Sequence, residues 1–216
     1  MIFADHRLSR DIDVFIDDPQ HLAVLSPELT DVWQCSAWDS SAHHLKLRYE
    51  EGEIDFLVTT PISSLVPVER QIDLTELRKG SKPIIRLDSP AEIALKKFHY
   101  RATMLKPRDV FDISVIHAIA GDTLAANLHE ISDKKDDLRR RLEATNEDFL
   151  QAELAELDIR PAWEPYKKTC LKTVREIEAD SGRALLSAVG MERVFASNVA
   201  SASDRRQASS ISFPSS

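Results

Sequence analysis

Residues 6–16, HRLSRDIDVFI, decide how the fold of this chain is interpreted. The second half of the stretch alternates between apolar and other side chains, which predicts a β-strand. Asp11 and Asp13 fall on the same face of that strand, about 7 Å apart. Aspartate is a poor strand former, and two like charges on one face repel each other. A divalent cation beside the carboxylates is the simplest way to offset that repulsion.

A second apolar strand containing an aspartate is predicted within residues 44–59, HLKLRYEEGEIDFLVT. Apolar and polar side chains alternate on both sides of Glu50–Glu53, which predicts a β-hairpin with its turn there. Asp55 interrupts the second strand. Carboxylate oxygens suit Mg²⁺, whose octahedral shell water and substrate phosphates complete, and paired metal ions serve phosphoryl transfer. The alternative is that each aspartate lies on the surface of an edge strand or ends its strand.

Basic residues gather in LKKFHYRATMLKPRD, residues 95–109 of an otherwise acidic chain. Ser-Pro-Ala-Glu at residues 89–92 predicts the start of a helix that continues to about residue 104. Lys97 and Arg101 lie one turn apart on that helix. Such a pair would clamp a triphosphate or an RNA backbone. The alternative is an ordinary solvated helix face.

A second helix is predicted to begin at Pro107. Asp109 lies in its first turn, where the helix dipole favours anions, and Asp112 lies one turn further on. Three roles stay open for these two aspartates. The first is to orient Lys97, the second is to act as a base, and the third is to cap the helix.

The organisation along the chain is predicted from composition and periodicity. Residues 61–88 are expected to form loops and short strands, and most of the chain after residue 120 is expected to be helical. We therefore predict a core at residues 1–120 and a helical C-terminal region at residues 121–196. The Ser-rich segment 197–216 is expected to be a disordered tail.

Overall composition excludes several classes of protein. The net charge of −8 over 216 residues argues against a surface that coats nucleic acid broadly. No apolar run approaches the length of a membrane span, and the N-terminus has no signal-peptide pattern. Cys35 and Cys170 match no metal or redox spacing. These features predict a cytoplasmic, reduced protein with no membrane association.

Three segments together resemble a known family. HRLSRDIDVFI, GEIDFLVT and SPAEIALKKFHYRATMLKPRDVFDI are similar to segments of the AbiEii-type nucleotidyltransferase toxins of bacterial abortive-infection and type IV toxin–antitoxin systems. The resemblance covers about residues 5–118. It implies an α+β fold with a polymerase-β-like nucleotidyltransferase core, a small mixed sheet with flanking helices, followed by a helical region.

The resemblance also implies an activity. Such an enzyme would transfer a nucleoside monophosphate from an NTP to an acceptor, for which the 3′ end of tRNA is a candidate. Mg²⁺ would be its cofactor, and a cognate antitoxin would be a partner. Within this chemistry, the resemblance places Asp55 where a third carboxylate would help to deprotonate the attacking hydroxyl group.

The residue patterns and the resemblance together predict the site. Ser9 and Arg10 come directly before the aspartate pair, where a hydroxyl group and loop amides would hold a phosphate. The predicted catalytic residues are Asp55, Lys97, Asp109 and Asp112, the predicted nucleotide-binding residues are Ser9, Arg10, Lys97 and Arg101, and the predicted metal ligands are Asp11, Asp13 and Asp55.

One departure from the family pattern bears on activity. Relatives usually carry a Gly-Gly segment before the RxSxDxD stretch, whereas this sequence has no glycine before Gly52. The true start lies upstream, or the protein has lost the segment, or the gene is a degraded relative. The last two explanations predict a non-catalytic nucleotide-binding, RNA-binding or interaction protein with a degenerate nucleotidyltransferase fold. Besides an active enzyme and a non-catalytic relative, the third hypothesis is a structural interaction protein whose acidic residues are surface charge.

Overall fold

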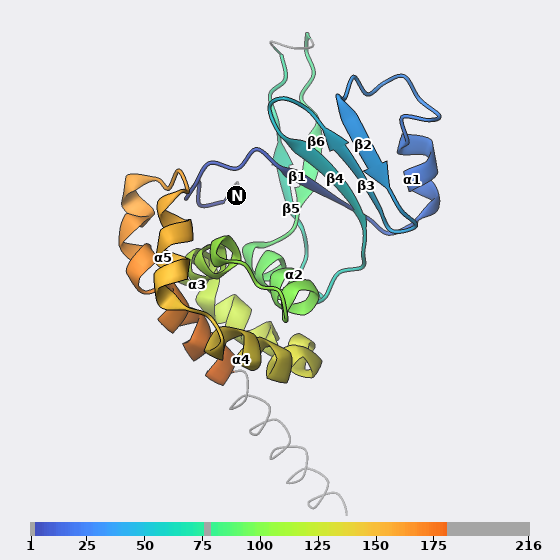
Figure 1. Ribbon diagram of the computed structural model, residues 1–216. Helices are drawn as coiled ribbons and strands as arrows, with labels where there is room; N and C mark the ends of the chain where they lie inside the picture. The colour runs from blue at the N-terminus through green and yellow to red at the C-terminus, as the bar shows by residue number, and fades with distance from the viewer. Residues whose placement is uncertain (1–2, 76–78, 181–216) are drawn as a thin grey trace, which may run out of the picture.

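A four-stranded mixed sheet forms the first half of the fold. The computed structural model describes residues 3–75 and 79–180. The strands are β1 (Ile12–Ile16), β2 (Ala37–Ser40), β3 (His44–Arg48) and β4 (Glu53–Val58). Their order is β1-β4-β3-β2, with β1 parallel to β4 and the other pairs antiparallel (Figure 1). The predicted β-hairpin is confirmed, although Glu53 belongs to β4 and not to the turn.

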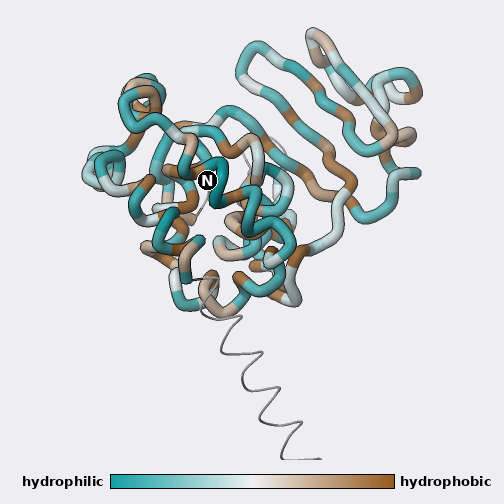
Figure 2. Tube along the Cα trace, turned by 60° about the horizontal axis from the view of Figure 1, so that its bottom comes forward, coloured by the Kyte–Doolittle hydropathy of each residue, from teal (hydrophilic) through white to brown (hydrophobic). Residues whose placement is uncertain are grey.

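One face of this sheet is apolar because strand side chains alternate between the two faces. Leu45 and Leu47 of β3 are fully buried there, and Phe56 of β4 lies opposite Leu45. The short helix α1 (Gln20–Leu25) covers this face with Leu22. Figure 2 shows the apolar stretches along these strands. The other face is consequently left for the polar side chains of the same strands.

Residues 61–88 contain the expected short strands. β5 (Val68–Gln71) and β6 (Ile84–Leu87) form a separate two-stranded antiparallel sheet. The chain then enters α2 (Pro90–Arg101), whose N-cap is Ser89, with its hydroxyl group accepting from the backbone of Glu92. This confirms the predicted helix start, since Ser at the N-cap and Pro at the first position are its sequence signals.

The second predicted helix is α3 (Pro107–Asn127). It begins at Pro107 as expected, and the carboxylate of Asp109 accepts from the backbone N–H of Lys106. This contact satisfies a backbone donor just ahead of the helix. A kink with non-helical dihedral angles lies at Ala120. Asp109 therefore caps the helix while its side chain stays beside α2.

The predicted helical region follows in short pieces. They are η1 (Leu128–Lys134), α4 (Lys135–Glu143), α5 (Glu147–Ala155), η2 (Pro161–Lys168) and a helical stretch at residues 170–180. Within the described parts of the chain, no helix is long and apolar enough to cross a membrane. The predicted tail at residues 197–216 lies outside the described residues.

The helices share one apolar cluster, separate from that of the sheet. Phe98 of α2 and Phe111 of α3 are fully buried in it together with Leu150 of α5. This cluster includes residues from both sides of position 120, and the domain boundary proposed there stays a prediction. The α+β class is confirmed.

The N-terminal segment ties the two halves together. Before entering β1, it runs along the loop that precedes η2. The backbone N–H of Leu8 donates to Asp158 at 2.9 Å, and that of Arg160 donates to His6 at 2.9 Å. These two backbone hydrogen bonds hold the segment that leads into β1 against the C-terminal helical region.

Candidate functional site

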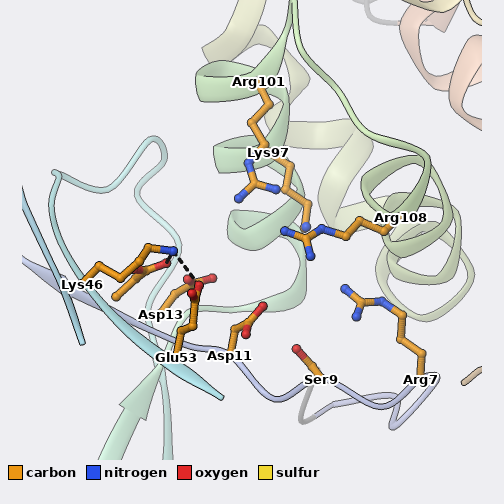
Figure 3. Close-up of a pocket in the computed structure, with 10 residues that line it drawn as sticks. Arg7, Ser9, Asp11, Asp13, Lys46, Glu53, Lys97, Arg101 and Arg108 are labelled. Carbon is orange, nitrogen blue, oxygen red and sulfur yellow. Dashed lines mark hydrogen bonds and ion pairs between the residues drawn. The ribbon is translucent and has the colours of Figure 1, made fainter. Parts of the chain in front are cut away.

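A polar hollow lies between the second face of the sheet and helices α2 and α3. Figure 3 shows that side chains from the two sides point toward one another across it. Carboxylates come mainly from the sheet side and cations mainly from the helices. Its lining residues are Arg7, Ser9, Asp11, Asp13, Lys46, Glu53, Asp55, Lys97, Arg101 and Arg108.

Strand pairing assembles the sheet side of the hollow. Asp13 of β1 is the register partner of Asp55 in the parallel pair β1–β4. Asp55 is in turn the register partner of Lys46 in the antiparallel pair β3–β4. Register partners present their side chains to the same face. Three neighbouring strands therefore place two carboxylates and one ammonium group in a row, with Asp11 just before β1 at its end.

The carboxylates on this side are not fully neutralised by the protein. Desolvation by the surrounding chain, followed by the nearby charge of Asp55, raises the pKa of Asp13, although Asp13 remains open to solvent on one side. Lys46 Nζ lies 3.1 Å from Oδ2 of Asp55. The other oxygen, Oδ1, is buried and has no hydrogen-bond partner among the described residues. An acceptor atom is thus left available beside a site of excess negative charge.

The helix side carries cations that are held by a buried carboxylate. Asp109 is fully buried, and its Oδ1 accepts from Lys97 Nζ and from Arg101 Nη1, each at 2.7 Å. Burial by itself would raise the pKa of Asp109, but Lys97 and Arg101 outweigh that effect and lower it. Asp109 therefore stays charged and aligns two cations, one helical turn apart, toward the hollow.

A second buried carboxylate fastens the N-terminal segment to the same helix. Asp112 accepts two hydrogen bonds from the guanidinium group of Arg7, both at 2.8 Å, and one from Nε2 of His6 at 2.7 Å. Lys97 Nζ lies 3.1 Å from its Oδ2. Burial would raise the pKa of Asp112, but Lys97 and the hydrogen-bond donors around it hold the pKa well below its usual value.

Arg108 differs from the other cations of the hollow. It forms no ion pair with any carboxylate of residues 3–75 and 79–180, whereas the other lining cations each contact at least one. In Figure 3 its side chain extends from α3 into the hollow beside Lys97. Because its charge is uncommitted, Arg108 is well placed to meet an anionic ligand.

The carboxylate oxygens of the hollow suit Mg²⁺ only if other ligands complete its coordination shell. Within the described part of the chain, no three His, Cys, Asp or Glu side chains form a metal-binding group by themselves. Mg²⁺ commonly takes only one or two carboxylates, and substrate phosphates and water supply the rest. The free oxygen of Asp55 and the repulsion between Asp13 and Asp55 fit a cation bound in that way.

The sequence-predicted residues are mostly brought together. Ser9, Lys97, Arg101 and the three metal-ligand candidates line the hollow. Asp109 and Asp112 lie behind the cations and bind them, which fits the orienting role. Arg10 is exposed and does not line the hollow. Its backbone carbonyl instead lies so close to Gly52 that an added Cβ there would be 2.0 Å from the oxygen.

Four residues near the hollow were assigned no site role from the sequence. The predicted turn at Glu50–Glu53 would pair Asp55 with Arg48, whereas the observed turn lies one residue earlier and pairs Asp55 with Lys46. Arg7 and His6 gave no local signal, since their partner Asp112 lies more than 100 positions away. The four residues are His6, Arg7, Lys46 and Glu53, whereas Arg108 belongs to the basic segment 95–109 that was predicted to clamp a triphosphate or an RNA backbone.

Comparison with known proteins supports the resemblance noted in the sequence. A sequence model described as nucleotidyl transferase AbiEii toxin, type IV toxin–antitoxin system, matches residues 1–187. No curated protein and no solved structure was found to match the chain. The fold agrees with the family, since a small mixed sheet with flanking helices is followed by a helical region. Because the match covers most of the 216 residues, the chain belongs to the AbiEii family of nucleotidyl transferase toxins.

Proposed function

We propose that this protein is a Mg²⁺-dependent nucleotidyltransferase that transfers a nucleoside monophosphate from an NTP to an RNA acceptor. The observation that carries the proposal is the pairing of opposite charges across one hollow. Asp11, Asp13 and Asp55 lie on the sheet side, and cations of α2 and α3 face them. Phosphoryl transfer requires this combination of carboxylates for metal and cations for phosphate.

The helix-side cations would receive the triphosphate. Lys97 has three donors, donates one hydrogen bond to Asp109 and forms an ion pair with Asp112. Arg101 uses one nitrogen on Asp109, and Arg108 is uncommitted within the described chain. Each therefore retains donors for phosphate oxygens without breaking its present contacts.

The sheet-side carboxylates would hold the metal. Asp11 and Asp13, which line the hollow, would be the paired ligands, and the unpartnered Oδ1 of Asp55 would supply a further oxygen. When bound, Mg²⁺ would offset the repulsion between these carboxylates and stabilise negative charge on the phosphates. Ser9, three residues before β1, would donate a hydrogen bond from its hydroxyl group to a phosphate oxygen.

The proposed reaction is an in-line displacement. A hydroxyl oxygen of the acceptor attacks the α-phosphorus, the bond from that phosphorus to the bridging β-phosphate oxygen breaks, and pyrophosphate leaves. The proton of the hydroxyl group passes to the carboxylate of Asp55. Lys97 and Arg101 balance the charge that develops on the leaving pyrophosphate.

The biological setting is inferred from the family and from charge. The name of the family refers to a type IV toxin–antitoxin system, so we propose that the activity is toxic and that a cognate antitoxin opposes it. The net charge of −8 confines RNA contact to a basic patch. The segment from Lys96 to Arg108 is that patch, and the 3′ end of tRNA is the acceptor we propose, in the cytoplasm.

The test is incubation of purified protein with each α-³²P-labelled NTP, Mg²⁺ and total cellular RNA. The matched control is Asp11→Asn/Asp13→Asn, which removes two charges while keeping side-chain shape. We expect RNA to be labelled by the wild type only, and Arg108→Gln to need a higher NTP concentration. If no NTP labels RNA, or if the double variant labels it equally, the proposal is wrong and a non-catalytic relative is the better description.

A further inference from the structure

Lys46 stands among the carboxylates of the sheet side, although no role has been assigned to it above. Its Nζ lies 2.7 Å from Oε2 of Glu53 and 3.1 Å from Oδ2 of Asp55. Both partners come from the neighbouring strand β4. The Lys46 side chain is 26% exposed, and Figure 3 shows it reaching toward the carboxylates from β3.

Within residues 3–75 and 79–180, Lys46 is the only cation carried by a strand of the sheet that lines the hollow. The carboxylates on that side are Asp11, Asp13, Glu53 and Asp55. The ammonium group of Lys46 donates a hydrogen bond to Glu53. Glu53 is itself held from its other side by Arg48, with 3.4 Å between Oε1 and Nε. The ammonium group is thus anchored beside Asp55.

The contact with Lys46 leaves the two carboxylate oxygens of Asp55 in different surroundings. Oδ2 faces the ammonium group, whereas Oδ1 is buried without a partner among the described residues. A carboxylate that is fixed on one oxygen presents the other in a single direction. A nearby fixed positive charge also weakens the attraction of the site for a cation.

We propose that Lys46 is a positioning residue that holds Oδ2 of Asp55, leaves only Oδ1 for a divalent cation, and limits how tightly that cation binds. The inference rests on the proposed function, because it concerns the cation that this function requires. Loose but directed binding suits an ion that must enter with NTP and leave with pyrophosphate. Removing the ammonium charge should therefore tighten cation binding while it slows transfer.

The experiment is titration with Mn²⁺ alone, followed by electron paramagnetic resonance of the free ion. Lys46→Gln removes the charge, and Lys46→Arg retains it. Lys134→Gln is the matched control, since Lys134 is 32% exposed and pairs with Asp133 at 2.9 Å away from the hollow. We expect Mn²⁺ to bind about tenfold more tightly to Lys46→Gln than to the wild type. Lys46→Arg and Lys134→Gln should stay within about threefold of the wild type.

The direction of the change separates positioning from a structural role. A loosened structure would only weaken Mn²⁺ binding, whereas the proposal requires tighter binding together with slower RNA labelling. Unchanged or weaker binding to Lys46→Gln, with RNA labelling by the wild type intact, overturns this inference and leaves the proposed function standing. If the wild type binds no Mn²⁺ and labels no RNA, the inference and the proposed function are both wrong.

Discussion

Asp13 and Asp55 lie directly opposite each other in the parallel strand pair β1–β4, and both carboxylates line the hollow. Two like charges at register partners destabilise a sheet. Desolvation and this proximity raise the pKa of Asp13, so its ionised form opposes folding at neutral pH. The pair is therefore a feature that stability alone does not explain.

Asp13→Asn is expected to raise stability and to abolish transfer. The gain should be at most about 1 kcal/mol without Mg²⁺, because solvent on the open side screens the charge. Urea unfolding measures the first effect, and RNA labelling measures the second. Asp17→Asn is the control, since Asp17 is exposed just after β1. A variant that is less stable than the wild type would contradict the repulsion argument.

Mg²⁺ with a non-hydrolysable NTP analogue is expected to stabilise the folded protein. A ligand that binds only the native state at one hundred times its Kd adds about 2.7 kcal/mol. For a chain of this size that corresponds to a rise in Tm of about 5–10 °C. Thermal melts of the wild type and of Asp11→Asn/Asp13→Asn provide the comparison. An equal shift in both proteins would place nucleotide binding elsewhere.

Asp112→Ala is expected to destabilise the protein by about 3–5 kcal/mol, the usual effect of removing one partner from a buried ion pair. Asp112 is 3% exposed, and its loss leaves Arg7 and Lys97 short of an acceptor. The comparison is Asp39→Ala, which removes an exposed partner of His44 and should cost less than about 1 kcal/mol. Similar losses in the two variants would show that the buried network contributes little.

Stability is expected to fall as the solution becomes acidic. The pKa values of Asp109 and Asp112 are both lowered in the folded protein. Below about pH 4 the unfolded chain binds more protons than the native state does, so the free energy of unfolding decreases with falling pH. Asp112→Asn should be less stable at pH 7 but should lose less stability between about pH 4 and 2. Urea titrations at stepped pH measure both slopes, and parallel slopes would refute the assignment.

Gly52→Ala is expected to weaken both stability and transfer. The added Cβ would lie 2.0 Å from the carbonyl oxygen of Arg10, so the backbone that carries Asp11 must move. Overpacking of this kind costs about 1–3 kcal/mol. Gly80→Ala is the control because its backbone has φ +74 with nothing within 4 Å. It should lose stability through strain alone and keep its RNA-labelling activity.

Much of the secondary structure could be predicted because its signals are local. Alternation of side chains predicts β3 and β4, but the turn between them lies one residue earlier than predicted, because Glu53 pairs with Arg48 inside the strands. Ser89 and Pro107 mark helix starts because each satisfies or removes a backbone donor at that position. The carboxylates Asp13 and Asp55 were predicted to share a site from their places within apolar strands, and they share the same hollow.

The remaining features depend on contacts between distant segments. Asp109 and Asp112 had three possible roles by sequence; both hold Lys97 in the structure, and Asp109 also caps α3. Arg10 precedes the aspartate pair in the chain, but the close approach of Gly52 determines its position and leaves its side chain in solvent. Local patterns contain no information about such approaches.

Although it contains no sign of β2, the sequence by itself determined β1, β3 and β4, the starts of α2 and α3, and the set of charged residues that phosphoryl transfer would need. These follow from side-chain period, proline geometry and charge, which act over a few residues. Only the tertiary structure decided that His6 and Arg7 fasten the first strand to α3 through Asp112, and that Arg108 faces the carboxylates without a partner among the described residues. The physical reason is that burial and long-range pairing, not local preference, decide which charges meet.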